Sequence, residues 1–268
     1  MIPLTPSGRA SAAGELVYAI GDVHGCYDLL KELLAAITAD AAERSRGRRP
    51  ILVFLGDYVD RGPASDKVME AMVWLQARRD LEVHLLKGNH EQALLSFLDS
   101  PEDAAGWMTY GGRETLTGYG VVPPEPHDDP AAYLRARDAL LANMPASHLR
   151  LLERLELMAV VGDYAFVHAG VKPGVALEAQ AEHDLLWIRQ AFLDAPGPFE
   201  KVVVHGHTWR DERPQLLEHR IGIDTGAYLT GVLTALRLED GQRSILQAGR
   251  PFEGLAARAA KGRLTVEA

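Results

Sequence analysis

Cysteine is almost absent from this chain of 268 residues, in which Cys26 is the single cysteine. One cysteine excludes an internal disulfide framework, and it excludes zinc or iron–sulfur sites built from several thiolates. Ten histidines are present, so metal binding through nitrogen and oxygen atoms remains open. A chain with so little cysteine fits a reducing compartment, and we expect a cytoplasmic protein.

Long apolar runs and an excess of basic charge are also missing. No segment approaches the roughly 18 consecutive apolar residues of a membrane-spanning helix. The first residues, MIPLTPSG, have neither the basic start nor the apolar stretch of a signal peptide, so we expect no export leader. Lysine and arginine number 28 against 37 aspartate and glutamate, which gives a formal net charge of −9. This acidity disfavours nucleic acids and anionic membranes as partners, because both would be repelled at long range.

The first half of the chain alternates between two apolar patterns. Short apolar runs typical of buried strands occur at 16–21, 51–56 and 83–88. Each run is followed by apolar residues at helical spacing, at about 27–40, at 68–77 and from Glu91 onward. This order predicts βαβ units and a parallel sheet, whose functional loops lie at the carboxyl ends of the strands.

The second half, from residue 157, is rich in strand-like runs and tight turns. The runs are found at 157–161, 164–170, 201–206, 220–226, 233–240 and 243–247. A βα first half followed by a hairpin-rich second half predicts the α/β class, with two mixed sheets packed face to face and flanked by helices.

The remaining segments are interpreted as a tail and an insertion. Residues 1–14 have no periodic pattern, and we expect a flexible tail. Residues from about 99 to 156 lose the strand–helix alternation but contain two helical stretches near 131–143 and 146–156. We therefore predict a single domain over 15–268 with a helical cap inserted at about 99–156.

Five short polar motifs each follow a strand-like run. They are GDVHG at 21–25, GDYVDRG at 56–62, GNHE at 88–91, HAG at 168–170 and GHT at 206–208. Each motif alone is a weak signal, because a histidine or aspartate after a strand is most often structural. Their recurrence is more informative, since oxygen donors and imidazoles follow successive strands beside glycines that allow tight turns.

These motifs together predict a site for two metal ions. Two dications about 3.5–4 Å apart require a bridging carboxylate, neutral imidazoles and a shared water, which the ions acidify into a nucleophile. Asp57 is the candidate bridge. One ion would take Asp22 and His24, and the other Asn89, His168 and His207. Manganese, iron, zinc or mixed pairs all suit such ligands.

The ordered motifs GDVHG, GDYVDRG, GNHE, VHAG and HGHT resemble those of the calcineurin-like metallophosphoesterases. The resemblance is to the phosphoprotein-phosphatase branch, which includes eukaryotic serine/threonine phosphatases and bacterial and phage relatives. It spans about 16–236, and WMTYGGRETLTGYGV, DLLWIR and IGIDTGAYLTGVLTAL are similar to the bacterial subgroup. It implies an αββα sandwich of two mixed sheets, two divalent metal ions with Mn²⁺ expected, and hydrolysis of phosphoserine, phosphothreonine or other phosphoesters by a metal-bridging hydroxide.

The same resemblance implies roles for residues around the metal ions. Arg61 would grip phosphate oxygens, and Arg189 in DLLWIR would do so from the opposite side. Asn89 and His90 would also contact the substrate. His90 would be the general acid that protonates the departing alkoxide, and Asp60 would hold it protonated and oriented.

Several neighbouring residues keep two interpretations. His205 lies two residues before His207, so it is either a structural histidine or a support for that ligand. Asp224 either orients a ligand histidine or is a turn carboxylate. Cys26 is either a packing residue at a helix start or an oxidisable thiol. Lys87 stands where relatives often have arginine, and it is assigned no catalytic role.

Two other functions compete with the phosphatase. A symmetrical bis(5'-nucleosyl)-tetraphosphate hydrolase would use the same metal ions on a phosphoanhydride, but that branch commonly departs from the Asp60-Arg61-Gly62 sequence that is intact here. A metal-stabilised binding module without activity would have a broken catalytic position, and none is found. The partner we expect is a phosphorylated protein or a small phosphoester.

Overall fold

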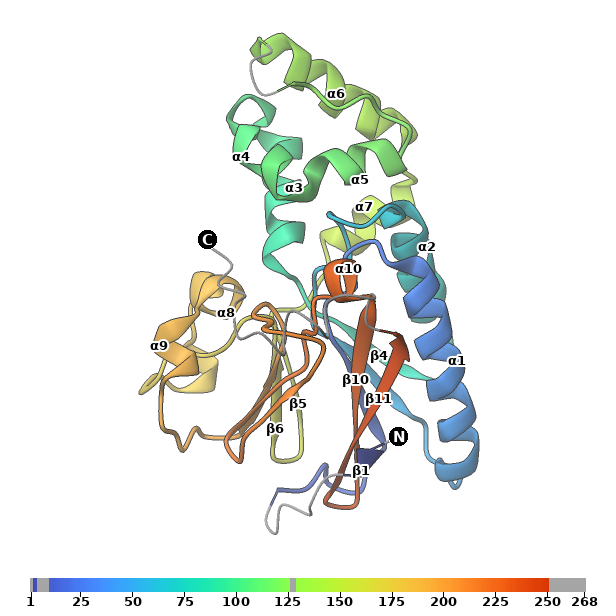
Figure 1. Ribbon diagram of the computed structural model, residues 1–268, viewed down its shortest axis with the longest axis vertical. Coiled ribbons are helices and arrows are strands. Elements are labelled where there is room, and N and C mark those ends of the chain that lie inside the picture. Colours follow the sequence, from blue (N-terminus) through green and yellow to red (C-terminus); the bar gives the residue numbers. More distant parts are fainter. Residues whose placement is uncertain (1, 4–9, 126–128, 251–268) are drawn as a thin grey trace.

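The computed structural model describes residues 2–3, 10–125 and 129–250, which form two β-sheets and their surrounding helices (Figure 1). The first sheet has the order β1(Ile2–Pro3), β11(Gln242–Gly249), β10(Val232–Glu239), β2(Val17–Ile20), β3(Ile51–Phe54), β4(Glu82–Leu85). The second has the order β5(Met158–Val161), β6(Tyr164–Val167), β7(Val202–His205), β9(Arg220–Gly222), β8(Gln215–Leu216). Each sheet combines parallel and antiparallel pairs, which confirms the predicted α/β class with two mixed sheets.

Parallel pairing brings the ends of the central strands to one level. In the first sheet Ile20 pairs with Phe54, and Phe54 pairs with Leu85. In the second sheet Val167 pairs with His205. The strands concerned are β2, β3 and β4 in the first sheet and β6 and β7 in the second. The loops that follow them therefore start side by side at one edge of each sheet.

The core lies on both faces of the first sheet. Alternate residues of the central strands, such as Val17, Val53 and Leu236, pack between the sheets with Phe166 and Val204. Their neighbours face the opposite way and pack under the helices. A strand buried on both faces has an uninterrupted apolar sequence, which explains why these strands were visible as apolar runs.

Helices cover the outer face of each sheet (Figure 1). On the first sheet these are α1(Tyr27–Arg44) and α2(Ser65–Gln76), and on the second they include α8(Glu182–Trp187) and α9(Gln190–Leu193). Helix α3(Asn89–Asp99) begins two residues earlier than predicted, so Asn89 and His90 lie in its first turn.

The insertion between the two halves is helical, and most of it lies at the top of Figure 1. Its elements are η1(Pro101–Asp103), α4(Ala105–Trp107), the π-helical turn η2(Met108–Gly112), α5(Arg113–Gly118), α6(Pro130–Asn143) and α7(Ala146–Leu152). The sequence pattern found α6 and α7 but missed the short helices at 105–118, which are too short to show a period.

The described part of the expected tail is attached to the domain. Strand β1 pairs with β11, the N–H of Ser11 donates to Asp163 Oδ2 at 2.9 Å, and Ala12 is buried. These described residues thus contact the domain through strand pairing, a hydrogen bond and the burial of Ala12, and the flexible tail over 1–14 stays a prediction. Residues 4–9 lie outside the described residues, as do 251–268 at the end of the expected domain.

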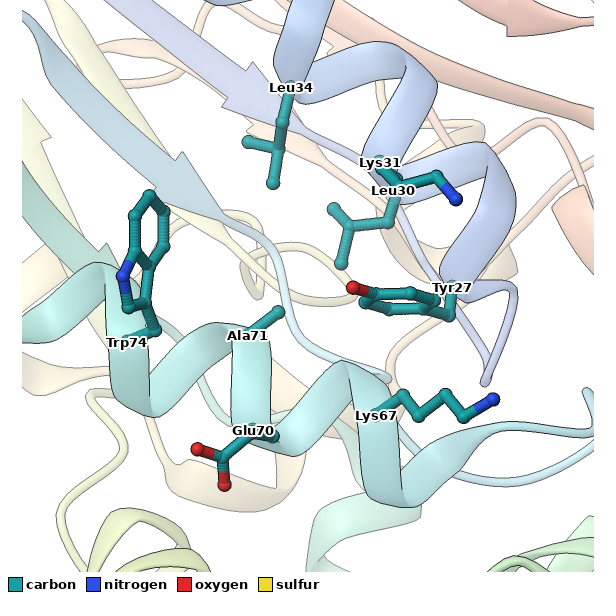
Figure 2. Close-up of a pocket in the computed structure, with 8 residues that line it drawn as sticks. All are labelled: Tyr27, Leu30, Lys31, Leu34, Lys67, Glu70, Ala71 and Trp74. Atoms are coloured by element: carbon teal, nitrogen blue, oxygen red, sulfur yellow. The ribbon is translucent and has the colours of Figure 1, made fainter.

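A groove of about 460 Å³ runs between α1 and α2 on the outer surface (Figure 2). Leu30, Leu34 and Ala71 give it an apolar lining, with Trp74 and Lys31 also facing it. None of the predicted site residues lines this groove. Among the described helices, none combines the length and apolar character needed to cross a membrane.

Candidate metal centre

The six predicted metal ligands lie together at the carboxyl ends of strands. They follow β2, β3, β4, β6 and β7, whose ends the parallel pairing aligns. No side chain among them is more than 8% exposed: Asp22, His24, Asp57, Asn89, His168 and His207. Residues that are far apart in the sequence thus form one buried polar group, as a metal site requires.

Asp57 belongs to two clusters of candidate ligand atoms. One cluster contains His24, Asp57 and His90, the other contains Asp57, His168 and His207, and the atoms of each lie within 4.8 Å of one another. Oδ2 of Asp57 is 3.4 Å from Nε2 of His24, whereas Oδ1 is 3.5 Å from Nε2 of His168. A carboxylate that turns its two oxygens toward two histidine clusters has the arrangement of a bridging ligand.

Asp22 lies in the site beside the two clusters. Its Oδ2 atom accepts the N–H of His207 at 2.9 Å, and the first cluster contains His90 as well as His24 and Asp57. Oδ1 of Asp22 is buried and receives no hydrogen bond from the described residues. Burial, together with the charges of Asp224 and Asp57, raises the pKa of Asp22 well above its usual range. A cation would satisfy this oxygen, and Asp22 therefore fits a metal site.

The histidines present neutral nitrogen atoms to the site. Nδ1 of His24 lies 2.9 Å from the carbonyl oxygen of Val59, and Nδ1 of His168 lies 2.8 Å from that of Leu55. If each Nδ1–H donates to its carbonyl, each Nε2 carries a lone pair. Burial lowers the pKa of His24 to about 3, and it also lowers the pKa of His168, so both rings are neutral at pH 7.

Asn89 brings two of these histidines to one point. Its Oδ1 atom is 2.8 Å from Nε2 of His168 and 2.9 Å from Nδ1 of His207. Burial also holds the pKa of His207 well below its usual range. With Nδ1–H of His168 directed at Leu55, the Nε2 lone pair of His168 faces Oδ1 of Asn89, and a cation would separate these two acceptors, whereas Nδ1–H of His207 can donate to the same oxygen. The donor set of imidazole, carboxylate and amide suits manganese, iron or zinc.

Backbone strain is concentrated in this site. Five of its non-glycine residues have φ between 44° and 73°, in the left-handed region: His24, Asp57, Asp60, Arg61 and His207. Each such residue costs roughly 1–3 kcal/mol and persists only where its surroundings fix it. The turns also need close backbone approach, because a Cβ on Gly62 would lie 2.0 Å from the carbonyl oxygen of His24. These strained turns therefore lower the stability of the fold, and they orient the side chains toward the site.

Glu91 is a further residue of the site, and sequence reasoning gave it no role. Its buried carboxylate accepts the backbone N–H groups of Asp57 at 2.8 Å, Tyr58 at 2.7 Å and Gly88 at 2.9 Å. Burial and the charge of Asp57 raise the pKa of Glu91 to about 7 despite these bonds. Glu91 thus ties the turn that carries Asp57 to the start of α3. Its place in the GNHE motif was the available signal.

His90 and Asp60 form a buried pair beside the clusters. Nδ1 of His90 lies 2.6 Å from Oδ2 of Asp60, and Nε2 of His90 lies 3.4 Å from Nη2 of Arg61. Burial would lower the pKa of His90, but the charges of Asp57 and Asp60 outweigh it and hold the pKa above its usual value. Nδ1 of His90 is thus directed at Asp60, while Nε2, beside Arg61, faces the cluster of His24 and Asp57.

Arg189 reaches the opposite cluster. Its Nε–H donates to Nε2 of His207 at 3.2 Å, whereas Arg61 meets His90. The structure thus places one guanidinium group beside each cluster. Trp187 also lies against His207, with 6.4 Å between ring centroids.

The residues with two interpretations have other partners. His205 contacts the carbonyl of Gly206 and the guanidinium of Arg220, and these contacts support the end of β7. Asp224 accepts the N–H of Gly226 at 2.8 Å, as a turn carboxylate does, and its carboxyl group also meets that of Asp22. Burial raises the pKa of Cys26 to about 11, which leaves it a packing thiol at neutral pH. Lys87 forms an ion pair with Glu182 at 2.8 Å.

The chain belongs to the calcineurin-like phosphoesterase family, whose model matches residues 16–222. The fold, the strand-end clusters and this match together define a metallophosphoesterase.

Curated relatives fall into two functional groups. The chain is 27% identical over 256 residues to the asymmetrical bis(5'-nucleosyl)-tetraphosphatase PrpE of Oceanobacillus iheyensis, covering 87% of this chain and 92% of the relative. It is 28% identical to the symmetrical bis(5'-nucleosyl)-tetraphosphatase of Methylococcus capsulatus, covering 88% and 70%. It is 26% identical to serine/threonine-protein phosphatase 1 of Salmonella typhimurium, covering 83% and 92%.

A solved structure of a candidate diadenosine tetraphosphatase has the same fold. It superposes with a TM-score of 0.61 at 20% identity and covers 91% of this chain and 97% of the other. At this identity the likeness supports the fold alone.

Proposed function

We propose that this protein hydrolyses phosphomonoesters, with phosphoserine and phosphothreonine as the preferred class of substrate. The observation that carries the proposal is the buried Asp60–His90 pair, with 2.6 Å between Oδ2 and Nδ1. A serine or threonine alkoxide is a poor leaving group and needs a proton as the ester bond breaks. When a phosphoanhydride is cleaved, the leaving group is already a stable phosphate anion, and it needs such a proton far less.

Two divalent metal ions, Mn²⁺ in our expectation, would be held by the six ligands with Asp57 shared between them. One ion would be bound by Asp22 and His24, and the other by Asn89, His168 and His207. Bound there, the ions would supply an acidified water and positive charge for the phosphate oxygens.

The chain's own residues would perform the remaining work. Arg61 and Arg189 would bind phosphate oxygens through their guanidinium groups, and Asn89 would lie close enough to orient the phosphate. As the oxygen of that water bonds to phosphorus and its proton passes to solvent, the ester P–O bond breaks and the leaving oxygen takes a proton from Nε2 of His90. Asp60 keeps the ring oriented through Nδ1, and the imidazole regains its proton from solvent.

The substitution His90→Asn tests the role of the general acid. With the metal supplied, turnover should fall roughly 10²–10⁴-fold on a phosphoserine peptide but much less on nitrophenyl phosphate, whose leaving group needs little protonation. Equal losses on both substrates would contradict the assignment. Failure of the purified enzyme to release phosphate from any phosphoester, with metal bound, would support a binding module instead.

A second candidate is a bis(5'-nucleosyl)-tetraphosphate hydrolase, symmetrical or asymmetrical. It is favoured by the relatives named for that activity and by Trp187, which is 39% exposed beside His207 and offers a surface for a nucleobase. Rates on a phosphopeptide and on diadenosine tetraphosphate, measured side by side, would separate the candidates. Product analysis would then show whether the anhydride is cleaved at its centre.

A further inference from the structure

Asp60 receives hydrogen bonds from two residues of the helical insertion. The carboxylate is fully buried, and its Oδ2 atom accepts the indole N–H of Trp107 at 2.7 Å. The hydroxyl of Thr115 lies 2.6 Å from Oδ1 and also 2.8 Å from the backbone nitrogen of Asp60. Thr115 therefore donates to the carboxylate while it accepts the N–H of the same residue. Both oxygens of Asp60 are thus held from the insertion.

The indole of Trp107 is itself fixed. Its ring packs against Phe97 of α3, with 4.8 Å between centroids. On its other side lies Gly112, where an added Cβ would be 2.4 Å from the ring. The adjacent Gly111 has a φ of 118°, and an added Cβ there would be 2.5 Å from the nitrogen of Arg61. The π-helical turn at 108–112 therefore packs directly on the Asp60–Arg61 turn, and π-helical turns recur at functional sites.

These contacts constrain the direction of His90. Oδ2 of Asp60 lies between two N–H groups, that of Trp107 and that of His90 at 2.6 Å. The donation of Thr115 to Oδ1 prevents the carboxylate from rotating about its terminal bond. With the carboxylate fixed, the imidazole is held at Nδ1 and its Nε2 atom is directed toward the site. A carboxylate missing either donor would turn, and the ring would follow it.

We propose that Trp107 and Thr115 are positioning residues for the catalytic acid. Through Asp60, these two residues of the insertion would hold His90 in the orientation that delivers its proton. The proposal rests on the proposed role of His90. It assigns the segment at 105–118 a function in proton delivery that is separate from the metal ligands and from the phosphate-binding arginines.

The test compares leaving groups in the metal-loaded enzyme. Trp107→Phe keeps the ring packing and removes the N–H, while Thr115→Val keeps the shape and removes the hydroxyl. For each variant we expect kcat on a phosphoserine peptide to fall about 5- to 20-fold more than kcat on nitrophenyl phosphate, with KM little changed. Thr115→Ser keeps a hydroxyl at this position. It should retain most of the wild-type ratio between kcat on the phosphoserine peptide and kcat on nitrophenyl phosphate. Equal losses on both substrates would overturn the proposal.

Two controls separate this result from a general loss of structure. Thr117 lies on the same helix and bonds only the backbone oxygen of Arg113, so Thr117→Val should leave the ratio unchanged. A change in the ratio for Thr117→Val equal to that of Thr115→Val would overturn the proposal. Melting temperature and metal content report whether each variant is folded and loaded.

His90→Asn distinguishes failure of this proposal from failure of the proposed function. If His90→Asn shows the leaving-group effect and Trp107→Phe and Thr115→Val do not, only the positioning role is wrong. If His90→Asn shows none, the general-acid role itself fails. A readout independent of activity is the downfield proton signal of the His90 Nδ1–H, identified by its loss in His90→Asn. This signal should shift or broaden in Thr115→Val and persist unchanged in Thr117→Val.

Discussion

The ring of Tyr228 lies against the guanidinium of Arg61, with 4.7 Å between the ring centroid and Cζ. The hydroxyl of Tyr228 also accepts a hydrogen bond from Nη1 of Arg61. The rings of Tyr228 and His24 form a T-shaped pair with 5.3 Å between their centroids. Tyr228 follows the IGIDTGA segment, far from Arg61 in sequence, and it touches both a predicted ligand and a predicted phosphate-binding residue. It therefore restricts the positions that Arg61 can take.

Substitution of Tyr228 should weaken phosphate binding more than turnover. Tyr228→Leu removes the aromatic face, and a partly desolvated cation–π contact is worth about 1–2 kcal/mol, so KM should rise roughly 5- to 30-fold. The inhibition constant of inorganic phosphate should rise by a similar factor. Tyr228→Phe keeps the ring and should lose much less. A phosphate inhibition constant that is the same in Tyr228→Leu and wild type would contradict the role of this contact.

Metal removal should abolish phosphate binding as well as catalysis. The chain is acidic, with a formal charge of −9, and Asp22 and Asp57, ionised as metal ligands, would contribute −2 at the centre of the site. Two dications would turn that −2 into +2, before Arg61 and Arg189 are counted. Phosphate binding measured by calorimetry should therefore disappear on chelation and return with added Mn²⁺. Binding that is unchanged by chelation would contradict the electrostatic argument.

The matched variant for this experiment is Asp57→Asn. It keeps the shape of the side chain but removes the charge that both histidine clusters face. Bound metal measured by mass spectrometry should fall below the wild-type content, and most activity should be lost. Near-normal turnover of Asp57→Asn with metal present would exclude the bridging role.

The sequence was a good guide wherever a pattern repeats. The strands β2 and β3 are buried on both faces, so they were visible as apolar runs, and each is followed by a long amphipathic helix. The site motifs follow strands of both sheets, so parallel pairing within each sheet and the packing of the two sheets bring the six predicted ligands together. The sequence indicated metal ligands because glycines recur with carboxylates or imidazoles after successive strands.

The rest depends on contacts that leave no local pattern. Glu91 acts through four backbone N–H groups, and Trp107 donates to Asp60, which lies 47 positions earlier in the sequence. Neither contact has a period or a fixed spacing. Asp22 accepts the N–H of His207 from a loop of the other sheet, a contact that has no local pattern either. The N–H of Ser11 likewise donates to the distant Asp163, a contact that the local sequence could not indicate.

Trp187 should separate the two candidate substrates. A hydrogen bond from its indole N–H to Gln92 at 2.7 Å fixes the ring, which leaves an apolar face exposed near His207. If nucleotides are substrates, Trp187→Ala should raise KM for diadenosine tetraphosphate roughly 5- to 100-fold, because stacking on a base is worth about 1–3 kcal/mol. The effect on a short phosphopeptide should be much smaller.

The control for this measurement is Trp74→Ala. Trp74 is 54% exposed on α2, beside the groove of Figure 2, and it carries Arg78 over its ring at 4.8 Å. Its loss should leave both KM values unchanged. A KM for the dinucleotide that is equal in Trp187→Ala, Trp74→Ala and wild type would remove the structural support for the nucleotide candidate.

The last prediction concerns stability, and it is independent of the metal site. Asp40 is buried between α1 and β10, where it accepts hydrogen bonds from Tyr18 at 2.7 Å, Arg237 at 2.9 Å and Arg44 at 3.0 Å. Burial alone would raise the pKa of Asp40, but these bonds outweigh it and hold the pKa below its usual value. Breaking a buried ion pair costs about 3–5 kcal/mol, so Asp40→Asn should lower the free energy of unfolding by roughly that amount at pH 7.

The pH dependence of this cost has a definite sign. Because the pKa of Asp40 is lower in the folded chain than in the unfolded one, its stabilisation is complete above the unfolded value of about 3.9 and is lost as pH falls through the folded value. Urea unfolding of wild type and Asp40→Asn should therefore give a constant difference from pH 7 to pH 5 and a shrinking one below about pH 4. Asp28→Asn is the control, since Asp28 pairs with Lys31 at 3.4 Å on the exposed side of the same helix and should change stability little. A cost of Asp40→Asn that does not shrink at acid pH would mean that packing, and not the charge of Asp40, holds α1 to β10.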